Sequence, residues 1–135
     1  MSLALFVTGA RAVPAWVGSY IRRRLNQHAF TTELRLVFQG GASGVDRIAN
    51  QWAQTQGGSL ASVTMPAQWS KHGRAAGPRR NREMVNVACA LRNCGWEIVV
   101  VAFPCGASKG TRDMIKQAQE AGLTVEVHEL LETTK

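Results

Sequence analysis

Three glycine-rich turns constrain the fold of this chain most, because each one lies between an apolar, strand-like run and a segment with helical periodicity. They occupy residues 8–11, 40–44 and 104–111 of the 135 residues. In α/β proteins, a strand that ends in glycines and opens into a helix exposes backbone N–H groups to an anion, usually a phosphate. Three such turns predict a ligand pocket along one edge of a sheet.

Strands and helices are predicted to alternate along the chain. We expect strands at residues 3–8, 34–39, 59–64, 98–103 and 124–128. The run 98–103 is apolar without alternation, which is typical of a central parallel strand buried on both faces. Helices of ordinary length between the strands predict right-handed crossovers and a mostly parallel five-stranded sheet covered on both faces. The fold class is therefore α/β with three layers, α/β/α, in a single domain spanning residues 1–135.

Four helices fill the gaps between these strands. Pro14 fits the first turn of a helix whose apolar stripe runs from Trp16 to Leu25. The second helix carries apolar residues from position 45 to 53, Pro78 starts the third, and Gly122 ends the fourth. Residues 66–82 are predicted to form a long loop without regular structure, and such loops are usually functional.

The sequence indicates a cytoplasmic protein without a membrane-spanning segment. No run approaches the roughly 18 apolar residues that a membrane span needs, and residues 1–7 read as a first strand rather than a signal peptide. The three cysteines lack metal-ligand spacing and are expected to be free thiols in a reducing compartment. We predict no metal and no cofactor.

The net charge of +7 raises the question of an anionic partner. Part of the charge lies at residues 22–24, which are expected to form a solvated helix surface. The rest is concentrated between Lys71 and Arg82, interleaved with glycine and proline, which favours a basic loop over a helix face. Such a loop suits a small phosphorylated ligand as well as a polymer.

The first two turns supply candidate ligand-binding residues. Gly9 permits close backbone approach, and Arg11 is suited to bidentate phosphate binding. The second turn is an anion-binding nest of small residues, and Asp46 follows in the first turn of the next helix. Asp46 either complements the helix dipole, or accepts a hydrogen bond from a ribose hydroxyl, or orients an arginine. The candidates in the second turn are Gly40, Gly41, Ser43 and Gly44.

The long loop and the third turn supply the remaining candidates. Trp69 is suited to stacking on a base, Arg80 to phosphate contact and Asn81 to a base edge or ribose. In the third turn, N–H groups and a hydroxyl lie at a helix N-terminus, and Asp113 is the best-placed carboxylate for general acid or base work. The third-turn ligand candidates are Gly106, Gly110 and Thr111. Walker, nucleophile-elbow and dinucleotide fingerprints are absent from the sequence.

Four motifs in this order resemble a known family. They are VTGAR at 7–11, GGASGVD at 40–46, Trp69 with GPRRN at 77–81, and FP at 103–104 with GTRDM at 110–114. The pattern resembles the YspA/YpsA-related SLOG family over nearly the whole chain. The resemblance implies a Rossmann-like fold and binding of nucleotides or nucleotide-derived ligands. The same superfamily includes the LOG phosphoribohydrolases and the DNA-uptake protein DprA.

One departure from the LOG enzymes bears on activity. Their third turn continues from Gly-Thr to a catalytic glutamate, where this chain has Met114, so that Asp113 would have to substitute from one position earlier. We therefore expect a module that senses or sequesters a phosphorylated nucleotide. Phosphate and ribose would lie at Gly9, Gly41 and Gly110, with arginines 11 and 80 neutralising charge and residues 69 and 81 closing over the base.

Two alternatives remain open at this stage. One is a LOG-like phosphoribohydrolase that cleaves the N-glycosidic bond of a nucleoside monophosphate, with Asp46 or Asp113 as the catalytic carboxylate. The other is DprA-like nucleic-acid binding, which the positive charge favours. The resemblance to LOG-type proteins also implies a homodimer.

Overall fold

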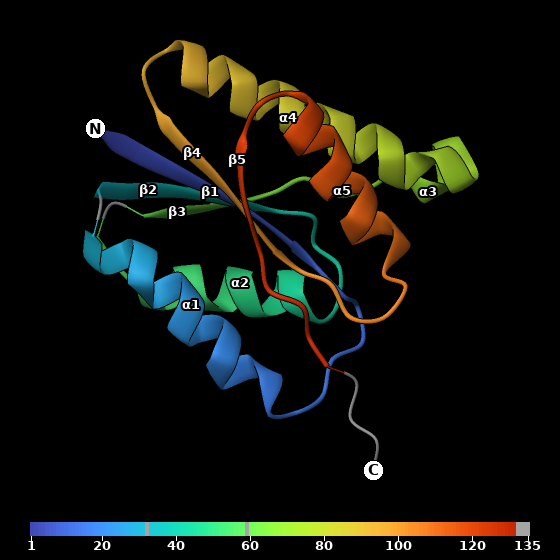
Figure 1. Ribbon diagram of the computed structural model, residues 1–135, viewed down its shortest axis with the longest axis horizontal. Helices are drawn as coiled ribbons and strands as arrows, with labels where there is room; N and C mark the ends of the chain where they lie inside the picture. The colour runs from blue at the N-terminus through green and yellow to red at the C-terminus, as the bar shows by residue number, and fades with distance from the viewer. Residues whose placement is uncertain (32, 59, 132–135) are drawn as a thin grey trace.

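The computed structural model describes residues 1–31, 33–58 and 60–131, and it is a three-layer α/β/α protein (Figure 1). Five strands form one sheet in the order β3-β2-β1-β4-β5, and all four pairings are parallel. This order confirms the predicted Rossmann-like fold class. The strands are β1 (Ser2–Gly9), β2 (Glu33–Gln39), β3 (Ala61–Thr64), β4 (Glu97–Phe103) and β5 (Thr124–Val127).

Helices cover both faces of the sheet, as parallel strands require. Figure 1 shows α1 and α2 below the sheet and α4 and α5 above it, with α3 beside the start of α4. The helices are α1 (Val17–Thr31), α2 (Val45–Thr55), α3 (Trp69–His72), the 3-10 turn η1 (Gly73–Ala75), α4 (Ala76–Asn93) and α5 (Lys109–Glu120). No helix in the described part of the chain is long and apolar enough to cross a membrane.

The alternation of side chains along β1 divides the core between the two faces. Leu3, Leu5 and Val7 pack with α1 and α2, whereas Ala4 and Phe6 pack with α4 and α5. All five side chains are fully buried. The sheet therefore lies between two apolar layers, and the polar turns lie at its carboxyl edge.

The predicted loop at residues 66–82 is wrong, because most of it is helical. α4 begins at Ala76, two residues before Pro78. Proline is tolerated there because the first-turn N–H groups of a helix have no intrahelical partner. Gly77 allows Trp69 to pack against the helix, since an added Cβ would lie 3.3 Å from the Trp69 ring. Gly73, with φ of +56°, separates α3 from α4.

Smaller differences concern the ends of elements. Trp16 was expected in the apolar stripe of the first helix, yet it precedes α1 and its side chain is 52% exposed. Pro14 lies in the turn before α1, where its carbonyl accepts the N–H of Val17 at 3.1 Å. The predicted strand start at residue 59 lies outside the described residues. Gly122 ends α5 with φ of +76°, as predicted.

Candidate ligand-binding cleft

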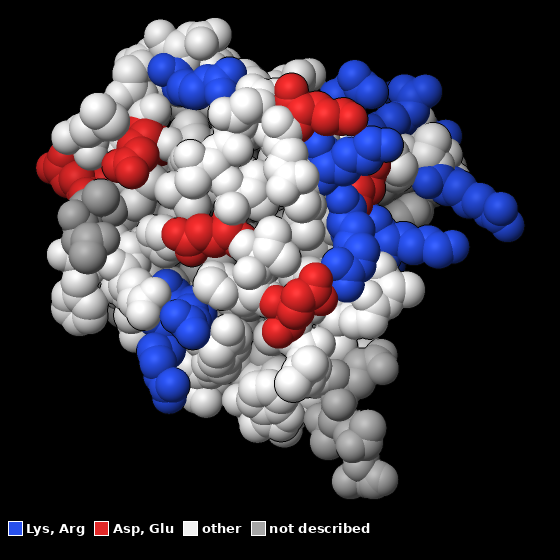
Figure 2. Space-filling model, in the orientation of Figure 1, with Lys and Arg blue, Asp and Glu red and all other residues white. Residues whose placement is uncertain are grey.

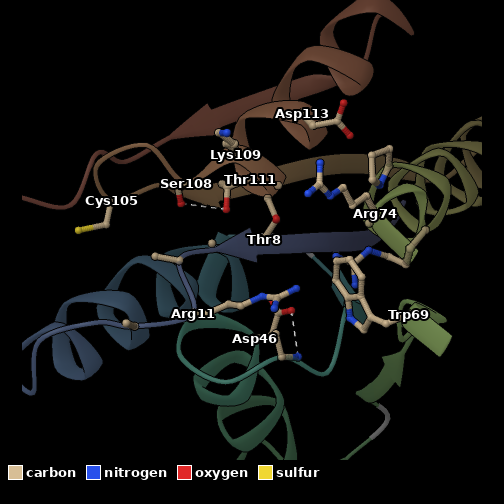
Figure 3. A pocket seen from close by; sticks show the side chains of 18 residues that line it. Thr8, Arg11, Asp46, Trp69, Arg74, Cys105, Ser108, Lys109, Thr111 and Asp113 are labelled. Carbon is tan, nitrogen blue, oxygen red and sulfur yellow. Dashed lines mark hydrogen bonds between the residues drawn. The ribbon is translucent and has the colours of Figure 1, made fainter. Parts of the chain in front are cut away.

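The three turns meet at the carboxyl edge of the sheet and border a cleft of about 810 Å³ (Figure 3). Parallel strands bring their carboxyl ends to one edge, where ligands of open α/β sheets bind. Figure 3 shows Arg11 and Asp46 on one side of the cleft and Asp113 on the opposite side. The lining residues are Thr8, Gly9, Ala10, Arg11, Ala12, Ala42, Asp46, Trp69, Arg74, Gly77, Pro78, Arg80, Cys105, Ser108, Lys109, Gly110, Thr111 and Asp113.

The structure brings part of the predicted site together around this cleft. The candidates that line it are Gly9, Arg11, Asp46, Trp69, Arg80, Gly110, Thr111 and Asp113. The candidates outside the lining are Gly40, Gly41, Ser43, Gly44, Asn81 and Gly106. The two groups differ in what their polar atoms contact, and the residues outside the lining mostly hold the turns in place.

The amide nest of the second turn binds a carboxylate of the chain itself. Asp46 Oδ2 accepts the N–H of Gly40 at 3.2 Å and the N–H of Ala42 at 3.3 Å. Gly41 donates its N–H to Gln39 Oε1 at 2.6 Å. These three amides are therefore satisfied within the chain and are not open to the expected phosphate contact. Gln39 had no signal in the sequence beyond its place at the end of a strand.

Two glycines allow the second turn to pack against the first. A Cβ on Gly9 would lie 2.5 Å from the Val45 side chain, and a Cβ on Gly44 would lie 2.3 Å from the Ala10 carbonyl oxygen. The contact is completed by the Val45 N–H, which donates to that carbonyl at 3.1 Å. Gly9 therefore allows α2 to approach β1, and Gly44 allows the backbone of the second turn to approach that of the first.

Arg80 lines the cleft and is held there by three hydrogen bonds. Its Nε donates to Asn81 Oδ1 at 3.0 Å, and its Nη1 donates to the carbonyls of Met65 at 3.2 Å and Gly40 at 3.4 Å. Gly40 makes room for it, because an added Cβ would collide with Nη1. Nη2 makes no hydrogen bond to the described residues. The side chain is half-buried, so a fixed guanidinium with an unoccupied edge lines the cleft.

Asn81 is buried behind the cleft and connects α4 to the start of α5. Its Nδ2 donates to the Gly110 carbonyl at 3.1 Å and to Asp113 Oδ2 at 2.9 Å. Gln117 Nε2 donates to the same carboxylate oxygen at 2.8 Å. The side chain of Asn81 is 1% exposed. It therefore orients Asp113 and the start of α5 from behind the cleft.

Burial raises the pKa of Asp46 to about 6. The two backbone N–H groups and the charges of Arg80 and Arg11 lower it, but burial dominates. Burial also lowers the pKa of the Arg80 guanidinium from its usual value. A carboxyl that titrates near neutral pH in a cleft is typical of functional sites.

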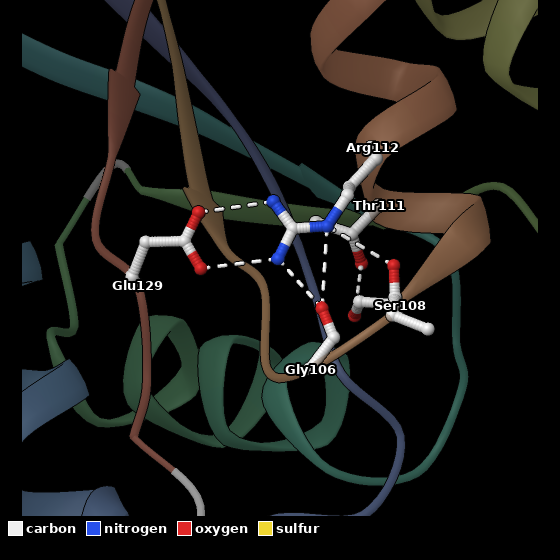
Figure 4. Close-up of polar contacts among 6 residues, drawn as sticks. Gly106, Ser108, Thr111, Arg112 and Glu129 are labelled. Atoms are coloured by element: carbon white, nitrogen blue, oxygen red, sulfur yellow. Dashed lines mark hydrogen bonds and ion pairs between the residues drawn. The ribbon is translucent and has the colours of Figure 1, made fainter.

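The third turn is braced from the end of the sheet (Figure 4). Arg112 pairs with both carboxylate oxygens of Glu129, at 2.9 and 3.1 Å, and its Nη2 donates to the Gly106 carbonyl at 2.6 Å. This contact raises the pKa of Arg112 and lowers the pKa of Glu129. Ser108, with φ of +41°, is the N-cap residue that precedes α5. The first amides of α5 have no intrahelical acceptor, and Lys109, Gly110 and Thr111 line the cleft.

Cations and an aromatic ring surround the mouth of the cleft. The Arg11 guanidinium lies over the Trp69 ring, 5.0 Å from its centroid, which is cation–π geometry. Arg74 and Lys109 line the same space and are exposed. Arg74 belongs to the basic segment that was predicted to contact an anion, and Lys109 belongs to the third glycine-rich turn. In the described residues, no group of three or more His, Cys, Asp or Glu side chains could hold a metal ion.

A parallel α/β sheet with a polar cleft at its carboxyl edge defines the class of Rossmann-like proteins. Comparison with known proteins places the chain more closely. The model of the YspA, cpYpsA-related SLOG family matches residues 5–72, and the chain belongs to this family. The match includes the first two turns and Trp69.

A phage relative extends this comparison. The chain is 39% identical over 93 residues to the Gene 61 protein of Mycobacterium phage D29, which covers 67% of this chain and 68% of that protein. No solved structure matches the chain significantly.

Proposed function

We propose that the chain binds a phosphorylated, nucleotide-like ligand in the cleft, with the phosphate at the start of α5. The observation that supports this most is the meeting of two anion-binding elements. The N-terminus of α5, at Lys109, Gly110 and Thr111, and the fixed guanidinium of Arg80 line the same cleft. Helix N-termini attract phosphate through unpaired amides and the helix dipole. Membership of the SLOG family supports a nucleotide-related role.

Gly110 is suited to close contact with a phosphate oxygen. An alanine Cβ built at this position meets no atom within 4 Å, so the backbone faces open space. Asn81 holds the carbonyl of Gly110 from behind, which fixes the orientation of this first turn. The turn is therefore preorganised, and preorganised sites lose little entropy on binding.

The base would lie at the other end of the cleft, against Trp69. Its ring is 47% exposed and already carries the Arg11 guanidinium. A flat, half-exposed aromatic face beside a cationic pocket suits a nucleobase, since stacking contributes about 1–3 kcal/mol per base. The cleft volume of about 810 Å³ lies in the range usual for small-molecule sites.

Thermal unfolding with a panel of ligands tests the proposal. The panel contains AMP, ATP, NAD, ADP-ribose, cyclic AMP and adenosine, which lacks phosphate. A ligand at 100 times its Kd adds about 2.7 kcal/mol to the free energy of unfolding, which raises the midpoint by several degrees. We expect a shift with a phosphorylated compound and a much smaller one with adenosine. Equal shifts with AMP and adenosine would contradict the phosphate site.

Hydrolysis of the N-glycosidic bond is the second candidate, and two carboxylates favour it. Asp46 and Asp113 line the cleft from opposite sides (Figure 3). Each receives two N–H donors on Oδ2, and neither Oδ1 has a hydrogen bond to the described residues. Fixed carboxylates of this kind can stabilise a ribosyl cation or activate water. Chromatography of AMP incubated with the protein distinguishes the two candidates. Released adenine would show hydrolysis of the N-glycosidic bond, whereas intact AMP would favour a binding module.

A further inference from the structure

A surface of exposed cations adjoins the cleft. Figure 2 shows Lys and Arg side chains gathered over α3, the start of α4 and α5. We call this surface the basic ridge, and its residues are Lys71, Arg74, Arg79, Arg82, Lys109 and Lys116. None of the six forms an ion pair within the described residues, whereas the exposed Arg35 and Arg112 are paired with Glu33 and Glu129. The ridge therefore keeps its charge available for a partner.

The basic ridge extends beyond what a mononucleotide can contact. Lys109 and Arg74 line the cleft, but Arg79, Arg82 and Lys116 do not. Arg79 and Arg82 are three residues apart on α4 and so share a side of that helix. Lys116 is seven residues after Lys109 on α5, about 10 Å along the same side. These three cations are exposed and lie outside the lining of the cleft.

The chemistry of the ridge favours a nucleic-acid strand over a membrane. Membrane-surface helices combine cations with exposed apolar side chains. Trp69 is the one exposed large hydrophobic residue among those described on α3, α4 and α5. An aromatic ring that lines a cleft, beside a track of unpaired cations, is the arrangement that binds single strands, whose bases stack and whose phosphates follow the charge.

We propose that the cleft and the basic ridge together bind single-stranded nucleic acid. One nucleotide would occupy the cleft, with its base against Trp69, and the neighbouring phosphates would lie along Arg79, Arg82 and Lys116. This inference rests on the proposed function, because it takes the cleft as the site of one nucleotide.

The test compares two triple variants of equal charge by fluorescence anisotropy with a labelled 12-nucleotide single strand. The ridge variant carries Arg79→Gln, Arg82→Gln and Lys116→Gln. The control carries Arg22→Gln, Arg23→Gln and Arg47→Gln on α1 and α2, which cover the other face of the sheet. Each single-strand phosphate contact contributes about −0.7 to the slope of log K against log salt. The ridge variant should flatten the slope by about 2 and weaken binding at least tenfold, whereas the control should leave the slope unchanged.

AMP separates this inference from the proposed function. We expect both triple variants to bind AMP as the wild type does, and excess AMP to compete with the strand. If AMP binds but the strand binds no more tightly than AMP, the inference fails and the proposed function stands. The inference would be overturned if the two triple variants lost equal affinity for the strand, or if excess AMP left strand binding unchanged. Binding to phosphatidylserine vesicles that depends on the ridge, without strand binding, would also overturn it. If neither AMP nor the strand binds, both proposals fail.

Discussion

Gly44→Ala is expected to lower the free energy of unfolding by about 3 kcal/mol or more. Gly44 has φ of +74° and ψ of −127°, a backbone conformation that glycine adopts almost exclusively. An added Cβ would also lie 2.3 Å from the Ala10 carbonyl oxygen and 2.5 Å from the Arg11 carbonyl oxygen. Backbone atoms cannot turn aside as a side chain can, so the second turn must separate from the first. Thermal unfolding should show a fall of roughly 10 °C.

Gly73→Ala is the matched control for this effect. Gly73 has nearly the same backbone conformation, with φ of +56° and ψ of −131°, but its Cβ would meet no atom within 4 Å. It therefore carries the conformational cost of about 1–3 kcal/mol without the collision. A fall as large in Gly73→Ala as in Gly44→Ala would show that close packing of the two turns contributes nothing.

Asp46→Asn is expected to make the protein more stable at neutral pH. The folded-state pKa of Asp46, about 6, lies above the reference value of 3.8. Between these two pKa values, Asp46 is protonated in the folded protein and ionised in the unfolded chain. The free energy of unfolding therefore falls as the pH rises from about 4 to 6. The effect amounts to about 3 kcal/mol. Asn lacks this titration and keeps one oxygen to accept the amides of Gly40 and Ala42.

Denaturant unfolding of wild type and Asp46→Asn between pH 4 and 7 measures this difference. The two proteins should be nearly equal at pH 4, and the variant should gain stability relative to wild type as pH rises through 6. A constant difference across this range would mean that Asp46 titrates normally. A buried carboxyl that destabilises the fold at neutral pH is typical of a site shaped by function.

The strands and their glycine turns were predictable because the signals are local. The apolar run of β4 and the glycines after β1 and β2 identify buried parallel strands and their ends without any tertiary information. Residues 66–82 were misassigned as a loop because Gly77 and Pro78 disrupt helices in general. Here they fall in the first turn of α4, where proline needs no hydrogen bond and Trp69 packs on the glycine.

The polar contacts of the cleft were less predictable, since they join distant parts of the chain. Asn81 contacts Asp113 across 32 positions, and Arg112 contacts Glu129 across 17. Only the tertiary fold shows that Asn81 is buried and that Asp46 fills the nest of the second turn. Sequence reasoning thus located the edge of the sheet that carries the cleft, but not which donors remain open there.

Calorimetric titration of AMP into the wild type and Gly110→Ala tests whether the phosphate lies at the start of α5. The substitution meets no neighbouring atom and replaces a glycine within a helix, so stability should be retained or raised by up to about 1 kcal/mol. The added methyl group would occupy the space that a phosphate oxygen needs. We expect AMP to bind the wild type, and to bind the Gly110→Ala variant at least tenfold more weakly. Equal affinity for both proteins, or no binding to the wild type, would contradict this expectation.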